Sequence, residues 1–112
     1  DIPAIAEAAH KAGATVIMDN TWSAGYYFQP FEHGVDVSVQ AATKYIVGHS
    51  DVMMGAASAG ATYYAKLRHT AQSFGQVVSP DDAALVARGL RTMPLRLRQS
   101  TASALKIAAP TR

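Results

Sequence analysis

The pattern of apolar and polar positions predicts a helix followed directly by a buried strand at the start of the chain. The segment "DIPAIAEAAHKAG" opens on Asp1 as a helix cap and ends at Gly13, a residue type that commonly terminates helices. The next segment, "ATVIMD", is an apolar run that closes on Asp19, which is typical of a buried strand in a parallel sheet. A helix leading straight into such a strand is half of an α/β unit. The apolar stripe of the helix consists of Ile2, Ile5, Ala6 and Ala9.

Further along, the pattern predicts a loop, two more strands and another helix. "NTWSAGYYFQPFEHG" carries the glycines and the proline of a loop. "VDVSVQA" alternates valines with polar residues and is predicted to be a strand, and "DVMMGAASAG" is a weaker third strand because of its glycines and alanines. "TYYAKLRHTAQSFG" repeats apolar residues at helical spacing.

The last third of the chain contains two helix-start signals and therefore predicts two helices. In "SPDDAALVARGL", Ser79 is the cap and Pro80 occupies the first helical position. The same helix-start signal recurs with Thr92 and Pro94 in "TMPLRLRQSTASALKIAA". Together the elements predict a single α/β domain without internal repeats or linkers.

Composition narrows the classes of function. Of the 112 residues, 49% are hydrophobic and 16% charged, and the net charge of +2 is too small to indicate a nucleic-acid-binding protein. We also expect no membrane span and no signal peptide. The chain has no cysteine, which excludes disulfides and thiolate metal sites and fits a reducing compartment. The missing initiator methionine and the ending "IAAPTR" predict a piece of a longer protein.

Two polar residues follow predicted strands, and together they indicate a chemical site. Asp19 ends the first strand, and Lys44 follows the second in "AATKYIVGHSD". Because strand carboxyl ends form the ligand crevice of open α/β sheets, both side chains are expected at one site. They could form a structural ion pair. Alternatively, pyridoxal phosphate binds as a Schiff base to a lysine while an acidic residue pairs with its pyridinium nitrogen. The hydroxyl of Thr43 would suit a phosphate oxygen.

The amino-acid sequences of three segments resemble those of the transsulfuration family, the pyridoxal-phosphate enzymes of cysteine and methionine metabolism. These segments are "VIMDNTW", "DVSVQAATKYIVGHSDVMMG" and "RGLRTMPLRLRQS", and the resemblance runs over essentially the whole chain. It implies part of the large domain of a fold-type I enzyme, a mostly parallel sheet flanked by helices. It also implies that Lys44 is the Schiff-base lysine, Asp19 the pyridinium partner and Thr43 a phosphate ligand. Many relatives have a serine where this chain has Ala41, so one phosphate contact is lost or supplied elsewhere.

Within the family, the sequences of these segments, including Ala41, resemble the β-lyase branch. That branch implies β-elimination from L-cystathionine, giving homocysteine, pyruvate and ammonia in methionine biosynthesis, with Lys44 carrying the protons. The alternatives are a γ-lyase or γ-replacement synthase of the same family and, in another class, a non-catalytic α/β module. The resemblance further implies a cytoplasmic homotetramer acting on a small amino-acid substrate. Since family members are several times longer, we expect the isolated 112-residue chain to be inactive.

Residues near the predicted site have structural and functional interpretations. Asn20 and Thr21 follow Asp19 directly and are candidates to support its carboxylate. His49 in "GHSD" is expected to be a hydrogen-bonded structural histidine. Three aromatic residues of the loop could line a substrate entrance, but we expect them to pack beneath the loop: Trp22, Tyr26 and Tyr27.

Two other groups of residues are not expected to form sites. The remaining histidines lack metal-ligand spacing, so no metal site is predicted; they are His10, His33 and His69. The one basic cluster lies on helix-like sequence without interleaved aromatic residues, so we expect a solvated face or a subunit contact. It comprises Arg88, Arg91, Arg96 and Arg98.

Overall fold

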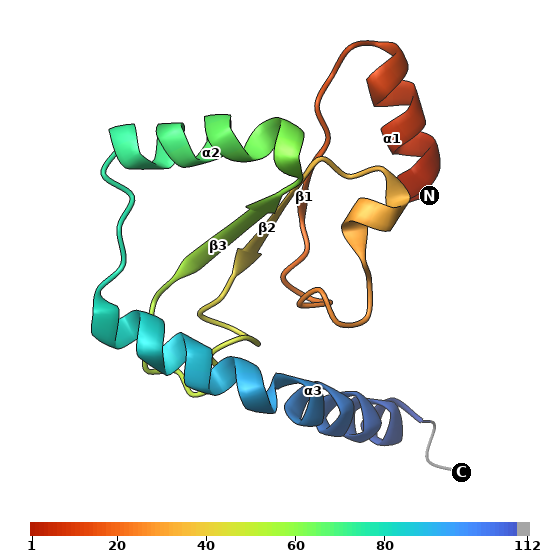
Figure 1. The fold of residues 1–112 in the computed structure, drawn as a ribbon. Coiled ribbons are helices and arrows are strands. Elements are labelled where there is room, and N and C mark those ends of the chain that lie inside the picture. The colour runs from red at the N-terminus through yellow and green to blue at the C-terminus, as the bar shows by residue number, and fades with distance from the viewer. Residues whose placement is uncertain (110–112) are drawn as a thin grey trace.

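The computed structural model describes residues 1–109 as a small three-stranded sheet with helices around it (Figure 1). The predicted α/β class is confirmed. The elements in chain order are α1 (Ile2–Lys11), β1 (Ile17–Asp19), the 3-10 helix η1 (Pro30–His33), β2 (Val37–Ala41), β3 (Gly55–Ala59), α2 (Ala61–Ser73) and α3 (Pro80–Ala108).

The first helix begins and ends as its sequence predicts. The Asp1 carboxylate accepts a hydrogen bond from the Ala4 amide at 3.3 Å, which satisfies one of the free amides of the first turn. Gly13 follows the helix with a φ of 73°, a left-handed conformation that glycine adopts at low cost. Ala6 is the residue of α1 that is fully buried.

The sheet has the order β1-β2-β3, with one parallel and one antiparallel pair, so it is mixed in this part of the domain. Asp19 of β1 pairs with Val39 of β2 in parallel register, and Ala41 pairs with Gly55 in antiparallel register. The expectation that β1 is buried is wrong for the described residues, since Ile17 is 64% exposed. β1 lies at the edge of this sheet, and no strand of residues 1–109 covers its outer side.

The last third of the chain forms one helix, α3, and not the two that were predicted. Ser79 caps it by accepting from the Asp82 amide at 3.0 Å, as expected. Thr92 caps nothing: its hydroxyl donates to the Gly89 carbonyl within the same helix at 3.1 Å. The helix continues through Pro94 and changes direction part-way along (Figure 1), as helices with an internal proline do.

Packing explains why α3 continues past its proline. Met93 and Leu97, on either side of Pro94, form a buried cluster with Ala24 of the loop after β1, and Ile46 packs against it. Burying such side chains contributes about 1.5–3 kcal/mol each, which offsets the cost of about 3 kcal/mol for an internal proline. None of the helices in the described part of the chain is long and apolar enough to cross a membrane.

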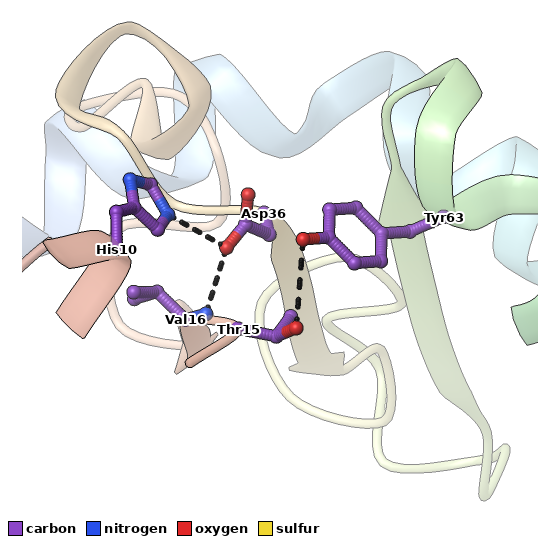
Figure 2. A network of polar contacts seen from close by, with 5 residues as sticks. All are labelled: His10, Thr15, Val16, Asp36 and Tyr63. Atoms are coloured by element: carbon purple, nitrogen blue, oxygen red, sulfur yellow. Dashed lines mark hydrogen bonds and ion pairs between the residues drawn. The ribbon is translucent and has the colours of Figure 1, made fainter. Parts of the chain in front are cut away.

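A network of polar contacts ties α1 to the start of the sheet (Figure 2). One oxygen of Asp36, just before β2, accepts from the Val16 amide at 2.8 Å and lies 2.9 Å from His10 Nε2. The Val16 amide, followed by the His10 contact, holds the pKa of Asp36 below its ordinary value. Beside it, the Thr15 hydroxyl lies 3.5 Å from the Tyr63 hydroxyl of α2. The network aligns β1 with β2 and thus sets where the two strands end.

Candidate active site

Lys44 lies in a tight turn that follows β2, residues 42–48, which we call the Lys44 turn. Its backbone is closed by hydrogen bonds from the Val47 amide to the Ala42 carbonyl and from the Gly48 amide to the Lys44 carbonyl, both 2.9 Å long. Ala42 is 0% exposed and Val47 1%, whereas the Lys44 side chain is exposed. The turn is thus anchored by its apolar residues and presents the lysine outward.

Asp19 ends β1, and the residue two positions later holds its carboxylate. The Thr21 hydroxyl donates to Asp19 Oδ1 at 2.6 Å, and the Thr21 amide donates to the same oxygen at 2.9 Å. These two hydrogen bonds, with a smaller contribution from the positive charge of Lys44, lower the pKa of Asp19 from its ordinary value against the opposing effect of burial. Thr21 is 5% exposed and also accepts from the Ala41 amide at 2.8 Å, so it links the two strand ends. The suggestion that Thr21 supports Asp19 is confirmed.

The parallel register of β1 and β2 brings Asp19 and Lys44 to the same end of the sheet, but the two do not touch. Ion pairs with N···O distances up to 4.0 Å within residues 1–109 involve other side chains, His10–Asp36, Lys11–Glu7 and Arg88–Asp51. Asp19 and Lys44 therefore form no direct salt bridge, whereas the non-catalytic alternative would require one. A carboxylate and an amine near the carboxyl ends of neighbouring strands are the two kinds of group that pyridoxal phosphate needs at the opposite ends of its ring.

Lys44 and Thr43 face one open hollow, and Asp19 borders a neighbouring one. The first is also lined by Trp22, Leu95, Arg96 and Gln99. Met53 lines both hollows. Trp22 is 84% exposed, so the expectation that it packs beneath its loop is wrong. Trp22 lines the first hollow, whereas Ala24 of the same loop is buried in the core cluster.

The hydroxyl of Thr43 is engaged with the backbone of the segment that leads into β3. It accepts from the Met54 amide at 2.8 Å and donates to the Met54 carbonyl at 3.2 Å. Since a threonine hydroxyl has a single proton, it would have to leave the Met54 carbonyl in order to donate to a phosphate. The assignment of Thr43 as a phosphate ligand stays a prediction.

Other predicted residues stabilise the loop and the turn around the site. Asn20 does not support Asp19, because its side chain donates to the Phe28 carbonyl at 3.2 Å. His49 is confirmed as a structural histidine, since its Nδ1 lies 2.6 Å from the Val47 carbonyl. The two tyrosines of the loop contact each other edge to face and reach α3 through their hydroxyls, Tyr26 to Arg98 and Tyr27 to Thr101.

The basic cluster of α3 is not simply a solvated face. Arg88 lies 3.6 Å from Asp51, and Arg98 donates to the Tyr26 hydroxyl at 2.8 Å. Arg96 binds backbone carbonyls of the Lys44 turn. Its neighbours in the sequence give no sign of this contact, because the residues it binds lie about 50 positions earlier in the chain.

The fold is that of a fold-type I pyridoxal-phosphate enzyme. The chain is similar to the crystal structure of cystathionine gamma synthase from Xanthomonas oryzae pv. oryzae in complex with cystathionine. The TM-score is 0.85 with 40% sequence identity, covering 94% of this chain and 28% of that one. The chain is accordingly part of the large cofactor-binding domain of such an enzyme.

Sequence comparison then gives the family. The model of the Cys/Met metabolism PLP-dependent enzymes matches residues 1–110, and the chain belongs to this family. A putative cystathionine beta-lyase of Rhizobium johnstonii is 51% identical over 108 residues, covering 96% of this chain and 27% of the relative. The cystathionine beta-lyase of Escherichia coli is 48% identical over 110 residues, covering 96% of this chain and 28% of the relative. The chain thus spans little more than a quarter of these relatives.

Proposed function

We propose that the full-length protein containing this chain is a carbon–sulfur lyase that uses pyridoxal phosphate to convert L-cystathionine and water into homocysteine, pyruvate and ammonia. The observation that carries the proposal is the placement of Asp19 and Lys44, without direct contact, near the carboxyl ends of β1 and β2. Lys44 offers an amine to an open hollow, and Asp19 on the neighbouring strand is kept anionic without touching it. The names of the beta-lyase relatives support the β-elimination in particular.

When bound, pyridoxal phosphate supplies an electron sink for the charge that develops at the substrate's α-carbon. Asp19 would hold the proton on the ring nitrogen, and its lowered pKa suits a partner that must stay negative. The Lys44 amine would bind the cofactor. Once free, it would take the α-proton and then return a proton to the departing sulfur.

The described residues supply few partners for the phosphate group. A dianionic phosphate needs several fixed donors, commonly a helix N-terminus with help from arginine. Ala41 has no hydroxyl, and the proton of Thr43 is engaged with Met54. We therefore expect the isolated chain to bind pyridoxal phosphate weakly and to release no pyruvate from cystathionine. The full-length protein should bind the cofactor tightly and release pyruvate. Tight stoichiometric binding by the isolated chain would contradict this view of the phosphate site.

Product analysis of the full-length protein tests the reaction. Incubation with L-cystathionine should yield pyruvate and homocysteine in equal amounts. Release of 2-oxobutyrate and cysteine would instead identify a γ-lyase. Condensation of cysteine with an activated homoserine to give cystathionine would identify a γ-replacement synthase; the structurally similar Xanthomonas protein is named a cystathionine gamma synthase. Either of the last two results would overturn the β-elimination while leaving the cofactor residues unaffected.

Covalent labelling tests the two cofactor residues. Borohydride reduction of the holoenzyme should fix the cofactor on Lys44, as read by peptide mass mapping. Label on another lysine of the chain, Lys11, Lys66 or Lys106, would defeat the assignment. We expect Lys44→Ala to abolish turnover. Asp19→Asn should keep the cofactor but lose at least about a hundredfold in kcat, because a neutral amide holds the ring proton poorly. Near-normal turnover of Asp19→Asn would remove this residue from the mechanism.

A further inference from the structure

Arg96 extends from α3 to the two backbone carbonyls that directly follow Lys44. Its Nη1 donates to the Tyr45 carbonyl at 2.8 Å, and its Nη2 donates to the Ile46 carbonyl at 2.9 Å. The planar guanidinium presents its donors in a fixed fork, so two neighbouring acceptors hold it in one orientation. This contact restrains the Tyr45–Ile46 and Ile46–Val47 peptide groups, which begin one residue after Lys44.

The guanidinium is also oriented by its own helix. Arg96 Nε donates to the Thr92 hydroxyl at 3.1 Å, and Nη2 donates to the Gly89 carbonyl at 2.9 Å. The same Thr92 hydroxyl donates to the Gly89 carbonyl at 3.1 Å. Arg96 is therefore held by α3 on one side and binds the Lys44 turn on the other, which makes it a rigid connection between them.

Two glycines make room for this connection. A Cβ at Gly48 would lie 1.9 Å from Arg96 Nη1, and a Cβ at Gly89 would lie 2.4 Å from the Val47 carbonyl. Real Cβ atoms essentially never approach heavy atoms that closely. At Gly89 the obstacles are backbone atoms, so the turn and the helix meet there at a separation that only glycine permits, whereas at Gly48 a side chain would displace the Arg96 guanidinium. Arg96 also lines the hollow that Lys44 faces.

We propose that Arg96 is a positioning residue that fixes the backbone of Lys44 during the reaction. The inference rests on the proposed function of Lys44. Such a lysine alternately binds a cofactor and carries protons, and its amine moves at the end of a long side chain. Its Cα must stay fixed so that the amine returns to the same place. A displacement of about 1 Å at such a group costs roughly a hundredfold in rate.

The test is Arg96→Lys in the full-length protein, with Arg91→Lys as the control. The replacement keeps the positive charge but loses the fork. Arg91 is an exposed arginine of the same helix. We expect Arg96→Lys to lower kcat by about 10- to 100-fold with KM changed less than about twofold. In the cofactor-free protein, the Val47 and Gly48 amides should exchange hydrogen at least about tenfold faster. The Arg91→Lys control should change none of these quantities.

Unchanged kcat with unchanged exchange in Arg96→Lys would overturn the proposal, and so would an equal loss in the Arg91→Lys control. If Arg96→Lys does not fold, Thr92→Val is the second variant, because it removes the acceptor that orients Arg96 Nε. It should change kcat and hydrogen exchange in the same direction by a smaller amount. Normal kcat and normal exchange in this variant would overturn the proposal. Failure of the proposed function is distinguished by borohydride labelling of the wild-type holoenzyme. Without label on Lys44 the function is wrong, and the proposal about Arg96 falls with it.

Discussion

Gly89→Ala adds one methyl group at the closest approach between α3 and the Lys44 turn. The new Cβ would lie 2.4 Å from the Val47 carbonyl oxygen and 2.6 Å from the Ile46 carbonyl oxygen. Both obstacles are backbone atoms, which cannot turn aside as the end of a flexible side chain can. The helix must therefore move away from the turn, or the turn must deform.

Two opposing effects decide the sign of this change. Replacing glycine by alanine inside a helix stabilises it by about 1 kcal/mol. Ordinary contact begins at 3.4 Å, so relieving the overlap with the Val47 oxygen requires a displacement of about 1 Å. Overpacking of this kind costs about 1–3 kcal/mol, and the shift also weakens the Arg96 hydrogen bonds, which contribute about 1 kcal/mol or more each. We expect a net destabilisation of about 1–3 kcal/mol.

The measurement is the melting temperature of the cofactor-free full-length protein, together with kcat of the holoenzyme. Gly89→Ala should lower the melting temperature by several degrees and reduce kcat by tenfold or more, on the order expected for a 1 Å displacement. Gly55→Ala is the control for the melting temperature, because nothing lies within 4 Å of its added Cβ and its φ is not in the left-handed region. A higher melting temperature and normal kcat in Gly89→Ala would refute the reasoning, since helix propensity alone would then govern the site.

Two further predictions concern carboxylates with lowered pKa values. Asp36 has its pKa lowered from 3.8 chiefly by the Val16 amide, so its stabilisation is present above pH 3.8 and is lost as the pH falls through the lowered value. Asp36→Asn should therefore reduce stability by about 1–2 kcal/mol at pH 6, and the gap to wild type in melting curves should close in stronger acid; a gap constant with pH would contradict the assignment. At the other carboxylate, Thr21→Val should reduce kcat about tenfold and move its acid-side fall to higher pH, because Asp19 loses the hydroxyl that lowers its pKa. Thr21→Ser keeps that hydroxyl and should keep most of kcat, so equal losses in the two variants would count against the hydrogen bond.

The sequence by itself determined the features that depend on neighbouring residues. The caps Asp1 and Ser79 form as predicted because the side chain and the amide it binds are three residues apart. The α/β class was predicted from the apolar stripe of α1 and the alternating valines of β2, because each pattern indicates which face of the element is buried. The candidate pair Asp19 and Lys44 was found because parallel strands bring their carboxyl ends to one edge. The separation of this pair, however, was not readable from the sequence.

Only the tertiary structure decided what depends on partners far along the chain. Thr92 and Pro94 have the local signature of a helix start, but core contacts of Met93 and Leu97 carry α3 through them. Thr43 looked free for a ligand until β3 brought the Met54 backbone to its hydroxyl. Arg96 looked like one member of a solvated cluster, yet its acceptors lie 50 and 51 residues away. Local propensity is a weak free-energy term, and packing or hydrogen bonding across such separations overrides it once the chain has folded.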